Sequence, residues 1–507
     1  MKTLAELVGC LLHAEVRGPL DRQVTGLAYH SSRVRPGNLF VCLPGTRSHG
    51  RRYAAEALAA GAVAVVTDRN DLQIENATVI IVPNTRLALA ILSAYFYDFP
   101  SQHLVLTGVT GTNGKTTTTW LIDTLLKSTG AATGLLGTVH YQIRGEEFPS
   151  AATTPEASDL QAMLSKMVKA KVKYATMEVS SHALAWYRTV GCDFDTVVLT
   201  NITEDHLDFH RTFEHYLGSK SKLFAWLGSM PIKRKRLKHA VLNGDDEYWR
   251  HLAEQTPAEI LLYGLSKHCH VRADNIKVTR EGVSYDLYTP FGSASIKLKM
   301  TGLFSVYNSL AAISVALLEN LDLAHIKAVI EEVKGIPGRF EMIDMGQDFT
   351  VIVDYAHTPD GLENILRAVR EFAPKRVLTV FGCGGERDRS KRPLMGQVAA
   401  TYSDFCIVTS DNPRGEDQAQ IFAEILPGLE KENANYLVLE DRKEAIEKML
   451  SLARSNDVVV IAGKGHETEQ VFRDYSIPFD DRQVVREWLQ RRLTQNGNDM
   501  QRGGSSR

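Results

Sequence analysis

The apolar residues of this chain fall into short runs separated by amphipathic stretches. Runs at residues 104–106, 174–179 and 194–199 are typical of buried strands, and a longer pattern near residues 310–318 has helical spacing. Strands that alternate with helices predict a mostly parallel sheet covered by helices on both faces. The fold class expected from this pattern is α/β.

The pattern changes twice along the chain and indicates three domains. A strand at residues 37–43, an alanine-rich helix from Ala54 and an apolar run at residues 62–66 predict a small α/β domain. Another domain is expected after residues 334–339, because four new apolar runs follow. We predict an N-terminal domain at residues 1–100, a central P-loop domain at 101–335, a C-terminal Rossmann-like domain at 336–493 and a disordered tail at 494–507.

Each apolar run of the predicted third domain is followed by polar or glycine-rich residues. In open parallel sheets, ligands gather beyond the carboxyl ends of the strands. Four segments are therefore expected to share one edge of a sheet: residues 354–357, 382–387, 411–414 and 463–467.

Composition narrows the class of protein. Lys+Arg 58 nearly balance Asp+Glu 60, so no global charge favours nucleic acid or an anionic membrane. The six cysteines form no Cys-x-x-Cys pair, which indicates reduced thiols in a cytoplasmic protein. No run approaches the roughly 18 apolar residues of a membrane span, and no heptad pattern predicts a dimer. A short basic run at residues 233–238 is expected to be a solvated loop.

Residues 107–117 have the composition of a phosphate-binding loop, because an apolar run leads into glycines, a lysine and threonines. Backbone N–H groups and a helix N-terminus would face a polyphosphate, Lys115 would add charge, and Thr116 would offer a hydroxyl to Mg²⁺. A plain glycine-rich turn is the weaker alternative. Binding of a nucleoside triphosphate is expected at Gly111, Thr112, Asn113, Gly114, Lys115, Thr116 and Thr117.

Three further features suit a metal site but also have ordinary explanations. Glu178 closes a predicted strand, although a lone buried glutamate is more often a structural partner. Acids and two histidines at residues 201–210 fit a metal site or a capped helix start about equally well. Lys220, taken alone, is a solvated helical lysine.

The combination of motifs resembles one family over nearly the whole chain, the Mur ligases, which are ATP-dependent enzymes that extend the peptidoglycan precursor. The motifs fall in the family's order, at residues 111–117, 178–182, 205–208, Asn308, 338–341 and 354–359.

The resemblance implies ATP bound with two Mg²⁺ ions, and metal contacts at Thr116, Glu178 and His206. Lys220 matches the lysine that family members carbamylate, and a carbamate is an anionic oxygen ligand that suits Mg²⁺. Lys115, His206 and Lys220 are the implied catalytic residues. Further nucleotide contacts are implied at Asn308, Arg339, Asp354 and His357.

The third domain decides which amino acid the resemblance implies. Residues 411–414 look like the signature of family members that add meso-diaminopimelate, because Arg414 can hold the extra carboxylate with a bidentate fork. An Asn-Pro turn with a surface arginine is the alternative. The implied contacts to the amino acid are Arg387, Asp411, Asn412, Pro413, Arg414, Gly463 and Glu467.

The other implied substrate is UDP-N-acetylmuramoyl-L-alanyl-D-glutamate, activated as an acyl phosphate before an amine attacks. Its contacts are implied at Ser31, Thr153, Thr154, Ser180 and Arg188. The chain departs from some relatives at Ala152 and Trp186.

Three rival hypotheses remain. An L-lysine-adding ligase would have no use for Arg414, and a folylpolyglutamate synthetase typically lacks the leading domain. A non-catalytic relative should have lost Lys115, Glu178, His206 or Lys220, and all four are present. The expected protein is a monomeric cytoplasmic ligase with no nucleic-acid or membrane partner.

Overall fold

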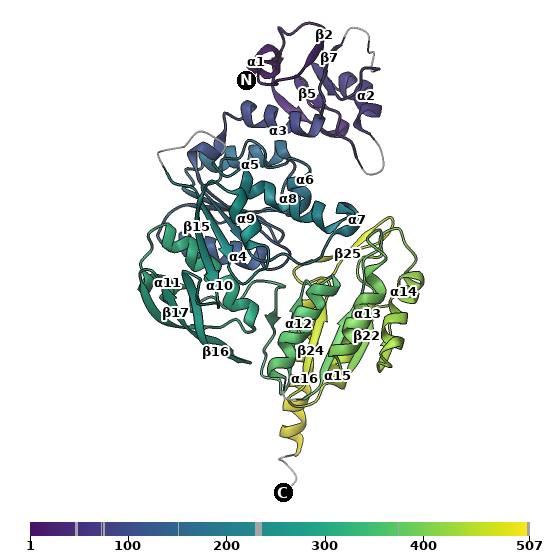
Figure 1. Ribbon diagram of the computed structural model, residues 1–507. Helices are drawn as coiled ribbons and strands as arrows, with labels where there is room; N and C mark the ends of the chain where they lie inside the picture. The colour runs from purple at the N-terminus through teal and green to yellow at the C-terminus, as the bar shows by residue number, and fades with distance from the viewer. Residues whose placement is uncertain are drawn as a thin grey trace. The chain divides into compact units, whose positions relative to one another are not determined.

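The computed structural model describes residues 1–45, 49–71, 74, 77–150, 152–228, 236–373 and 375–503. The chain divides into two compact units. Unit 1 comprises residues 1–202, 209–270 and 311–321, and unit 2 comprises residues 203–208, 271–310 and 322–507. Each unit is described by itself below (Figure 1).

Unit 1 begins with a five-stranded sheet in the order β2-β7-β6-β5-β4. Strand β5 (Asn38–Val41) is apolar on both faces because helices cover both. Leu39 packs into the core under α1 and α3, whereas Phe40 packs into the core under α2. The elements are β1 (Lys2–Thr3), α1 (Leu4–Gly9), β2 (Glu15–Arg17), β3 (Gln23–Val24), β4 (Gly26–Ala28), η1 (Ser31–Arg33), β5, η2 (Gly50–Tyr53), α2 (Ala54–Ala59), β6 (Ala64–Thr67), β7 (Thr78–Ile81), α3 (Thr85–Phe96) and η3 (Pro100–His103).

The rest of unit 1 is built on strands in the order β11-β10-β9-β12-β8-β13-β14-β15, and β9, β12, β8, β13, β14 and β15 run parallel. This confirms the predicted parallel sheet. Helix α4 packs on β12, β9 and β8, while α5 and α8 contribute to a core of alternate strand residues such as Leu106 and Met177. The elements are β8 (Val105–Thr110), α4 (Lys115–Lys127), β9 (Thr133–Leu136), β10 (Tyr141–Ile143), β11 (Glu146–Phe148), α5 (Ala157–Lys169), β12 (Tyr174–Glu178), α6 (Ser181–Ala185), β13 (Thr196–Leu199), α8 (Phe213–Ala225), β14 (His239–Asn243), α9 (Trp249–Gln255) and β15 (Glu259–Gly264).

Unit 2 contains the antiparallel strands β16 (Val271–Thr279), β17 (Gly282–Thr289) and β18 (Gly292–Leu298) and a six-stranded sheet in the order β19-β20-β24-β21-β22-β23. The other elements are α10 (Leu303–Leu318), which begins in this unit, α11 (Leu323–Ile330), β19 (Glu341–Met342), β20 (Thr350–Asp354), α12 (Pro359–Phe372), β21 (Val377–Phe381), α13 (Lys391–Tyr402), β22 (Phe405–Val408), α14 (Gln418–Lys431), β23 (Tyr436–Val438), α15 (Arg442–Leu452), β24 (Val458–Ala462), β25 (Glu469–Val471), β26 (Ser476–Pro478) and α16 (Asp481–Gly503).

Strand β24 explains why this sheet carries a continuous apolar run. Val458 and Val460 face a core formed with α12, α13 and α14, whereas Val459 and Ile461 face a core formed with α15 and α16. Strands β20, β24, β21, β22 and β23 are parallel. Their carboxyl ends therefore lie along one edge, as predicted for the four polar segments. We call this edge the rim, comprising residues 354–357, 382–387, 411–414 and 463–467.

The structure corrects two expectations. Residues 494–503, predicted to be a disordered tail, continue α16. Val484, Val485 and Leu489 anchor the start of that helix in a core, and each further residue then adds a backbone hydrogen bond. Residues 504–507 lie outside the described residues.

The second correction concerns the basic run at residues 233–238, whose first three residues lie outside the described ones. Lys238 is buried, not solvated, and its Nζ lies 2.6 Å from Asp193 Oδ1 and 3.6 Å from Asp195 Oδ1. Arg236 is ion-paired with Glu319. The parallel pairing of β14 with β13 brings this segment beside the acids that precede β13.

Among the described helices, none has the length and apolar character to cross a membrane.

Candidate functional site

The phosphate-binding loop lies between β8 and α4 of unit 1. Gly114 has φ +81 at the N-cap of α4, and Gly111 has φ +148. A Cβ on Gly111 would lie 1.8 Å from Thr200 Oγ1, so only glycine fits there. The N–H of Asn113 donates to Asn201 Oδ1 at 2.9 Å, which fixes the loop against the end of β13. The predicted loop is therefore formed, with α4 beginning at Lys115.

Two lysines converge on one carbonyl of this loop. Lys115 Nζ donates to the carbonyl oxygens of Gly111 at 3.0 Å and Thr112 at 2.8 Å. Lys220 Nζ, from α8, donates to the same Gly111 oxygen at 2.7 Å. Both lysines were predicted for the site, and the structure brings them together.

Lys220 is buried, with 1% of its surface exposed, so the solvated alternative is excluded. Its ammonium lies 4.6 Å from the centre of the Tyr216 ring, and the Tyr216 hydroxyl is 2.7 Å from Thr112 Oγ1. The helix thus holds Lys220 against the loop that would receive a phosphate. Tyr216 is a residue that sequence reasoning missed, and its spacing of four from Lys220 on one helix was the available signal.

The Glu178 carboxylate lies at the end of β12 and accepts hydrogen bonds from two threonines. Thr116 Oγ1 donates to Glu178 Oε2 at 3.0 Å, and Thr138 donates to Oε1 through its N–H at 2.7 Å. A Cβ on Gly137 would lie 2.5 Å from Glu178 Oε1, so this glycine leaves room for the carboxylate. A hydroxyl and a carboxylate are ligands of the kind Mg²⁺ prefers. Among the described residues, no group of three or more His, Cys, Asp or Glu side chains forms a metal site by itself.

Four of the five residues implied for the sugar-peptide substrate lie near β12 and α6. Thr154 Oγ1 donates to the Glu178 carbonyl at 2.8 Å and accepts from the Ser180 N–H at 3.0 Å. Thr153 Oγ1 lies 3.1 Å from Thr138 Oγ1. Arg188 donates to the Thr154 carbonyl at 2.9 Å. These contacts join the four residues to the Glu178 site.

A group that sequence reasoning missed surrounds Arg188. Glu156 Oε2 lies 3.2 Å from both Arg188 Nε and Arg86 Nη1. The Trp186 ring lies 4.3 Å from the Arg86 guanidinium and 5.0 Å from that of Arg188. Trp186, which departs from some relatives, therefore helps to hold two arginines. Ser31 begins the short helix η1, and its carbonyl accepts from Val34 N at 3.1 Å; its predicted uracil contact remains a prediction.

Two residues predicted for the nucleotide and metal site, His206 and Asn308, belong to unit 2. His206 precedes α7 (Leu207–His210), has φ +56, and its Nε2 lies 3.3 Å from Asp205 Oδ2. Asn308 is buried on α10. Both roles remain predictions, because these residues and the phosphate-binding loop belong to different units.

Asp354 and Arg339 form one end of the rim. The Asp354 carboxylate accepts from the N–H groups of Phe340 at 2.6 Å and Ala356 at 2.7 Å. Burial raises the pKa of Asp354, and the positive charge of Arg339 opposes that rise. The Arg339 guanidinium lies 4.6 Å from the centre of the Tyr355 ring. Gly338 must be glycine, since a Cβ there would lie 2.0 Å from His466 N.

His357 is held neutral beside this group. Its Nδ1 lies 2.8 Å from the Tyr355 carbonyl, so the ring donates through that nitrogen. Burial, followed by the charge of Lys391, lowers the pKa of His357 from its ordinary value of 6.5 to about 4. Burial also raises the pKa of Tyr355 to about 12.

The centre of the rim brings together the predicted amino-acid contacts. Asn412 Nδ2 donates to Glu467 Oε2 at 2.8 Å. Asp411 Oδ1 accepts from the N–H of Asn412 at 2.6 Å. Gly463 has φ +120, and a Cβ there would lie 2.7 Å from Asp411 Oδ2. Segments about 50 residues apart in sequence thus meet as expected from their strand ends.

Arg414 stands close to a second guanidinium. It has φ +51, follows Pro413, and donates to the Gly385 carbonyl at 2.9 Å. Burial, followed by the positive charge of Arg387, lowers the pKa of Arg414. Two nearby cations form a suitable site for a carboxylate. Arg414 also lines a cavity of about 360 Å³ whose wall includes Phe472, Arg473 and Tyr475.

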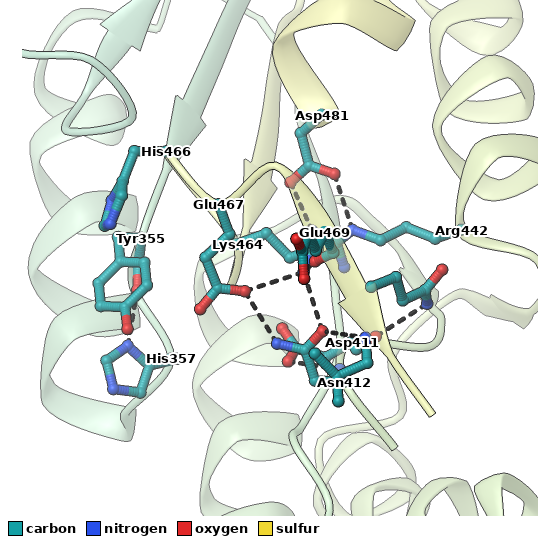
Figure 2. A network of polar contacts seen from close by, with 12 residues as sticks. Tyr355, His357, Asp411, Asn412, Arg442, Lys464, His466, Glu467, Glu469 and Asp481 are labelled. Atoms are coloured by element: carbon teal, nitrogen blue, oxygen red, sulfur yellow. Dashed lines mark hydrogen bonds and ion pairs between the residues drawn. The ribbon is translucent and has the colours of Figure 1, made fainter. Parts of the chain in front are cut away.

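Two buried cations, Lys464 in the rim and Arg442 next to it, were missed by sequence reasoning. Lys464 donates to Asn412 Oδ1 at 3.0 Å and to Glu467 Oε2 at 2.9 Å. Arg442 pairs with Asp481 at 2.7 Å. Figure 2 shows both cations beside the segments that carry Asp411 and Glu467. Lys464 lies in the predicted segment 463–467, but only Gly463 and Glu467 of that segment were predicted to contact the amino acid.

Comparison with known proteins gives three successive family matches. The Mur ligase family catalytic domain matches residues 23–97, the Mur ligase middle domain matches residues 109–316, and the Mur ligase glutamate ligase domain matches residues 338–465.

Individual relatives match nearly the whole chain. UDP-N-acetylmuramoyl-L-alanyl-D-glutamate--2,6-diaminopimelate ligase of Syntrophomonas wolfei is 47% identical over 96% of this chain and 99% of its own length. The protein of the same name from Geobacillus kaustophilus is 47% identical over 91% of this chain and 94% of its own. A solved structure of a ligase with that name is 33% identical with a TM-score of 0.65, covering 94% of this chain and 97% of that one.

Proposed function

This chain belongs to the Mur ligase family, and we propose that it joins meso-2,6-diaminopimelate to UDP-N-acetylmuramoyl-L-alanyl-D-glutamate at the expense of ATP. The observation that carries the proposal is the rim. Arg387 and Arg414 offer cations for a carboxylate, and Glu467 offers an anion for an ammonium group. An amino acid whose side chain ends in both a carboxylate and an ammonium group fits this arrangement. Relatives that bear the corresponding name are similar over nearly their full length.

The phosphate-binding loop supports the first step. The D-glutamate carboxylate would attack the γ-phosphorus of ATP, forming an acyl phosphate and releasing ADP. Lys115 would leave its carbonyl partners to follow the charge of the transferred phosphoryl group, while loop N–H groups hold the other phosphates. The convergence of Lys115 and the buried Lys220 on one carbonyl supports a strongly cationic phosphate site before any modification.

Thr116 and Glu178 would hold Mg²⁺, with His206 as a further ligand, and we propose two ions, as the family resemblance implies. The metal would neutralise phosphate oxygens and thereby make the phosphorus easier to attack. We also propose that Lys220 is carbamylated. The Gly111 carbonyl oxygen, which accepts a hydrogen bond from the Lys220 ammonium, would lose that donor on carbamylation. Lys115 already donates a hydrogen bond to the same oxygen.

The second step is amide formation. The amine of diaminopimelate would attack the acyl carbon, and the tetrahedral intermediate would expel inorganic phosphate. The Thr153, Thr154, Ser180 and Arg188 group adjoins Glu178, which supports a role in holding the peptide end of the UDP-sugar. The remaining proposed nucleotide contacts are Asn308, Arg339, Asp354 and His357. We propose a monomer that works in the bacterial cytoplasm, where this nucleotide-linked precursor is made.

Isotope transfer tests the mechanism directly. The UDP-precursor carries ¹⁸O in its D-glutamate side-chain carboxylate and is incubated with ATP, Mg²⁺ and meso-diaminopimelate. One ¹⁸O should appear in the released phosphate, and the product should gain one diaminopimelate residue by mass spectrometry. Product without ¹⁸O in phosphate would reject the acyl phosphate. Absence of product, with activity toward a folate substrate instead, would reject the proposed function.

A further inference from the structure

Lys464 is a fully buried lysine in the centre of the rim, with 0% of its surface exposed. Its ammonium donates to Asn412 Oδ1 at 3.0 Å, Glu467 Oε2 at 2.9 Å and the Glu469 carbonyl at 2.6 Å. An ammonium has three N–H donors, so these bonds use all of them. Figure 2 shows Lys464 close to Asn412 and Glu467.

These bonds determine how the Asn412 amide is oriented. Its Oδ1 accepts from Lys464 and from the N–H of Val471 at 3.0 Å. The amide Nδ2 must therefore point the other way, where it donates to Glu467 Oε2 at 2.8 Å. Lys464 thus fixes one oxygen of Glu467 and the donor face of Asn412 at the same time. Over the described residues, no hydrogen bond is recorded to Glu467 Oε1, and 30% of that side chain is exposed.

Lys464 also sets the charge of the rim. Arg387, Arg414 and Lys464 are cations, whereas Asp411 and Glu467 are carboxylates. Arg442 and Asp481 beneath them form a neutral pair. These five groups together have one excess positive charge, and without Lys464 their charges balance; Asp354 and Glu386 are further carboxylates elsewhere on the rim. The excess favours a ligand with an additional carboxylate over one that lacks it.

We propose that Lys464 is a positioning and specificity residue, which holds Asn412 and Glu467 in place and biases the rim toward meso-diaminopimelate over L-lysine. This inference rests on the proposed function. Diaminopimelate has two carboxylates and two ammonium groups, whereas lysine has one carboxylate and two ammonium groups. Loss of the Lys464 charge should therefore weaken the binding of diaminopimelate more than it weakens the binding of lysine.

Lys464→Met tests this inference, because methionine keeps the length of the side chain and removes its charge and donors. We expect the KM for diaminopimelate to rise about 10- to 100-fold, the range for lost hydrogen bonds to charged groups. The KM values for ATP and the UDP-precursor should stay within about twofold, and kcat should change less than the diaminopimelate KM. The ratio of kcat/KM for diaminopimelate to that for lysine should fall about tenfold or more.

Lys238→Met is the matched control, since Lys238 is another buried lysine paired with carboxylates, in unit 1. Both variants should lower Tm, but only Lys464→Met should change the amino-acid KM and the selectivity ratio. If Lys464→Met does not fold, Lys464→Gln retains a donor without the charge and should shift the ratio in the same direction. An unchanged ratio and diaminopimelate KM in a folded Lys464 variant would overturn the inference. Wild-type protein that ignores diaminopimelate would instead overturn the proposed function.

Discussion

The phosphate-binding loop and the rim hold their cations in opposite ways. Lys115 and Lys220 both donate to the Gly111 carbonyl, a neutral acceptor, at 3.0 and 2.7 Å. Lys464 and Arg442 are paired with carboxylates, at 2.9 Å from Glu467 and 2.7 Å from Asp481. A cation on a carbonyl keeps its charge for an incoming anion, whereas a cation on a carboxylate is largely neutralised and organises its surroundings.

This difference predicts different consequences of mutation. Removing Lys115 should abolish chemistry, because its charge is directed at the phosphates, and removing Lys220 should remove the proposed carbamate that would hold Mg²⁺. Changing a residue of the rim should alter which amino acid is used, or the stability of unit 2, more than the chemical step.

Lys115→Ala should produce the largest loss. Without this ammonium, charge on the transferred phosphoryl group is poorly stabilised, and kcat should fall at least about a thousandfold. Phosphate release with all substrates present is the measurement. Lys127→Ala is the control, because Lys127 is in the last turn of the same helix, and its activity should remain near wild type. Near-wild-type turnover by Lys115→Ala would contradict the nucleotide site.

Lys220→Ala should lower kcat at least about a hundredfold, and added short carboxylates should restore part of the activity. The reason is that a small acid can occupy the position of the carbamate. Lys222→Ala, two residues further on α8, should have almost full activity and no response to the acids. Lys220→Ala with full activity would exclude the carbamate, and a large loss without any rescue would argue for the ammonium itself.

Arg414→Lys should raise the KM for diaminopimelate about tenfold and leave the KM for ATP unchanged. Lysine retains the charge but loses the planar fork that binds a carboxylate with two hydrogen bonds. Initial rates over a range of amino-acid concentrations measure the effect. Arg389→Lys, at an exposed arginine paired with Glu424, should have no such effect. An unchanged KM for diaminopimelate would show that Arg414 does not bind this amino acid.

The smallest expected effect is a pH dependence of unit 2 stability through His357. Its pKa is lowered to about 4 in the folded protein, from 6.5. Between these values the unfolded chain binds a proton that the folded chain does not, so stability decreases as pH falls from 6.5 to 4, by up to about 3 kcal/mol. Urea unfolding of wild type and His357→Gln at several pH values isolates this contribution. Equal slopes for both proteins in that window would reject it.

The strand-loop-helix geometry of the phosphate-binding loop was predictable because its determinants are contiguous, whereas its phosphate contacts stay predictions. Glycines, Lys115 and Thr116 occupy one strand-loop-helix segment, and backbone geometry at Gly111 and Gly114 follows from residue type. The rim was predictable in outline, since parallel strands end at a common edge. Its inner contacts were not, because Lys464 meets Asn412 only after β22 and β24 have taken their places in the sheet.

The two corrections have the same origin. Lys238 belongs to a basic run whose local composition favours solvent, but the pairing of β13 and β14 brings it to Asp193. Residues 494–503 are polar, yet they continue a helix whose start is anchored by Val485 and Leu489. In both places a tertiary contact elsewhere decides the local structure, and no local pattern carries that information.

The most direct test of the proposed function is phosphate release by the purified protein with ATP, Mg²⁺ and UDP-N-acetylmuramoyl-L-alanyl-D-glutamate, compared among meso-diaminopimelate, L-lysine and no amino acid. We expect release that depends on diaminopimelate, with little release in the other two reactions. Equal or faster release with L-lysine would contradict the role assigned to the cations of the rim, and no release with any of the three would contradict the proposed ligase.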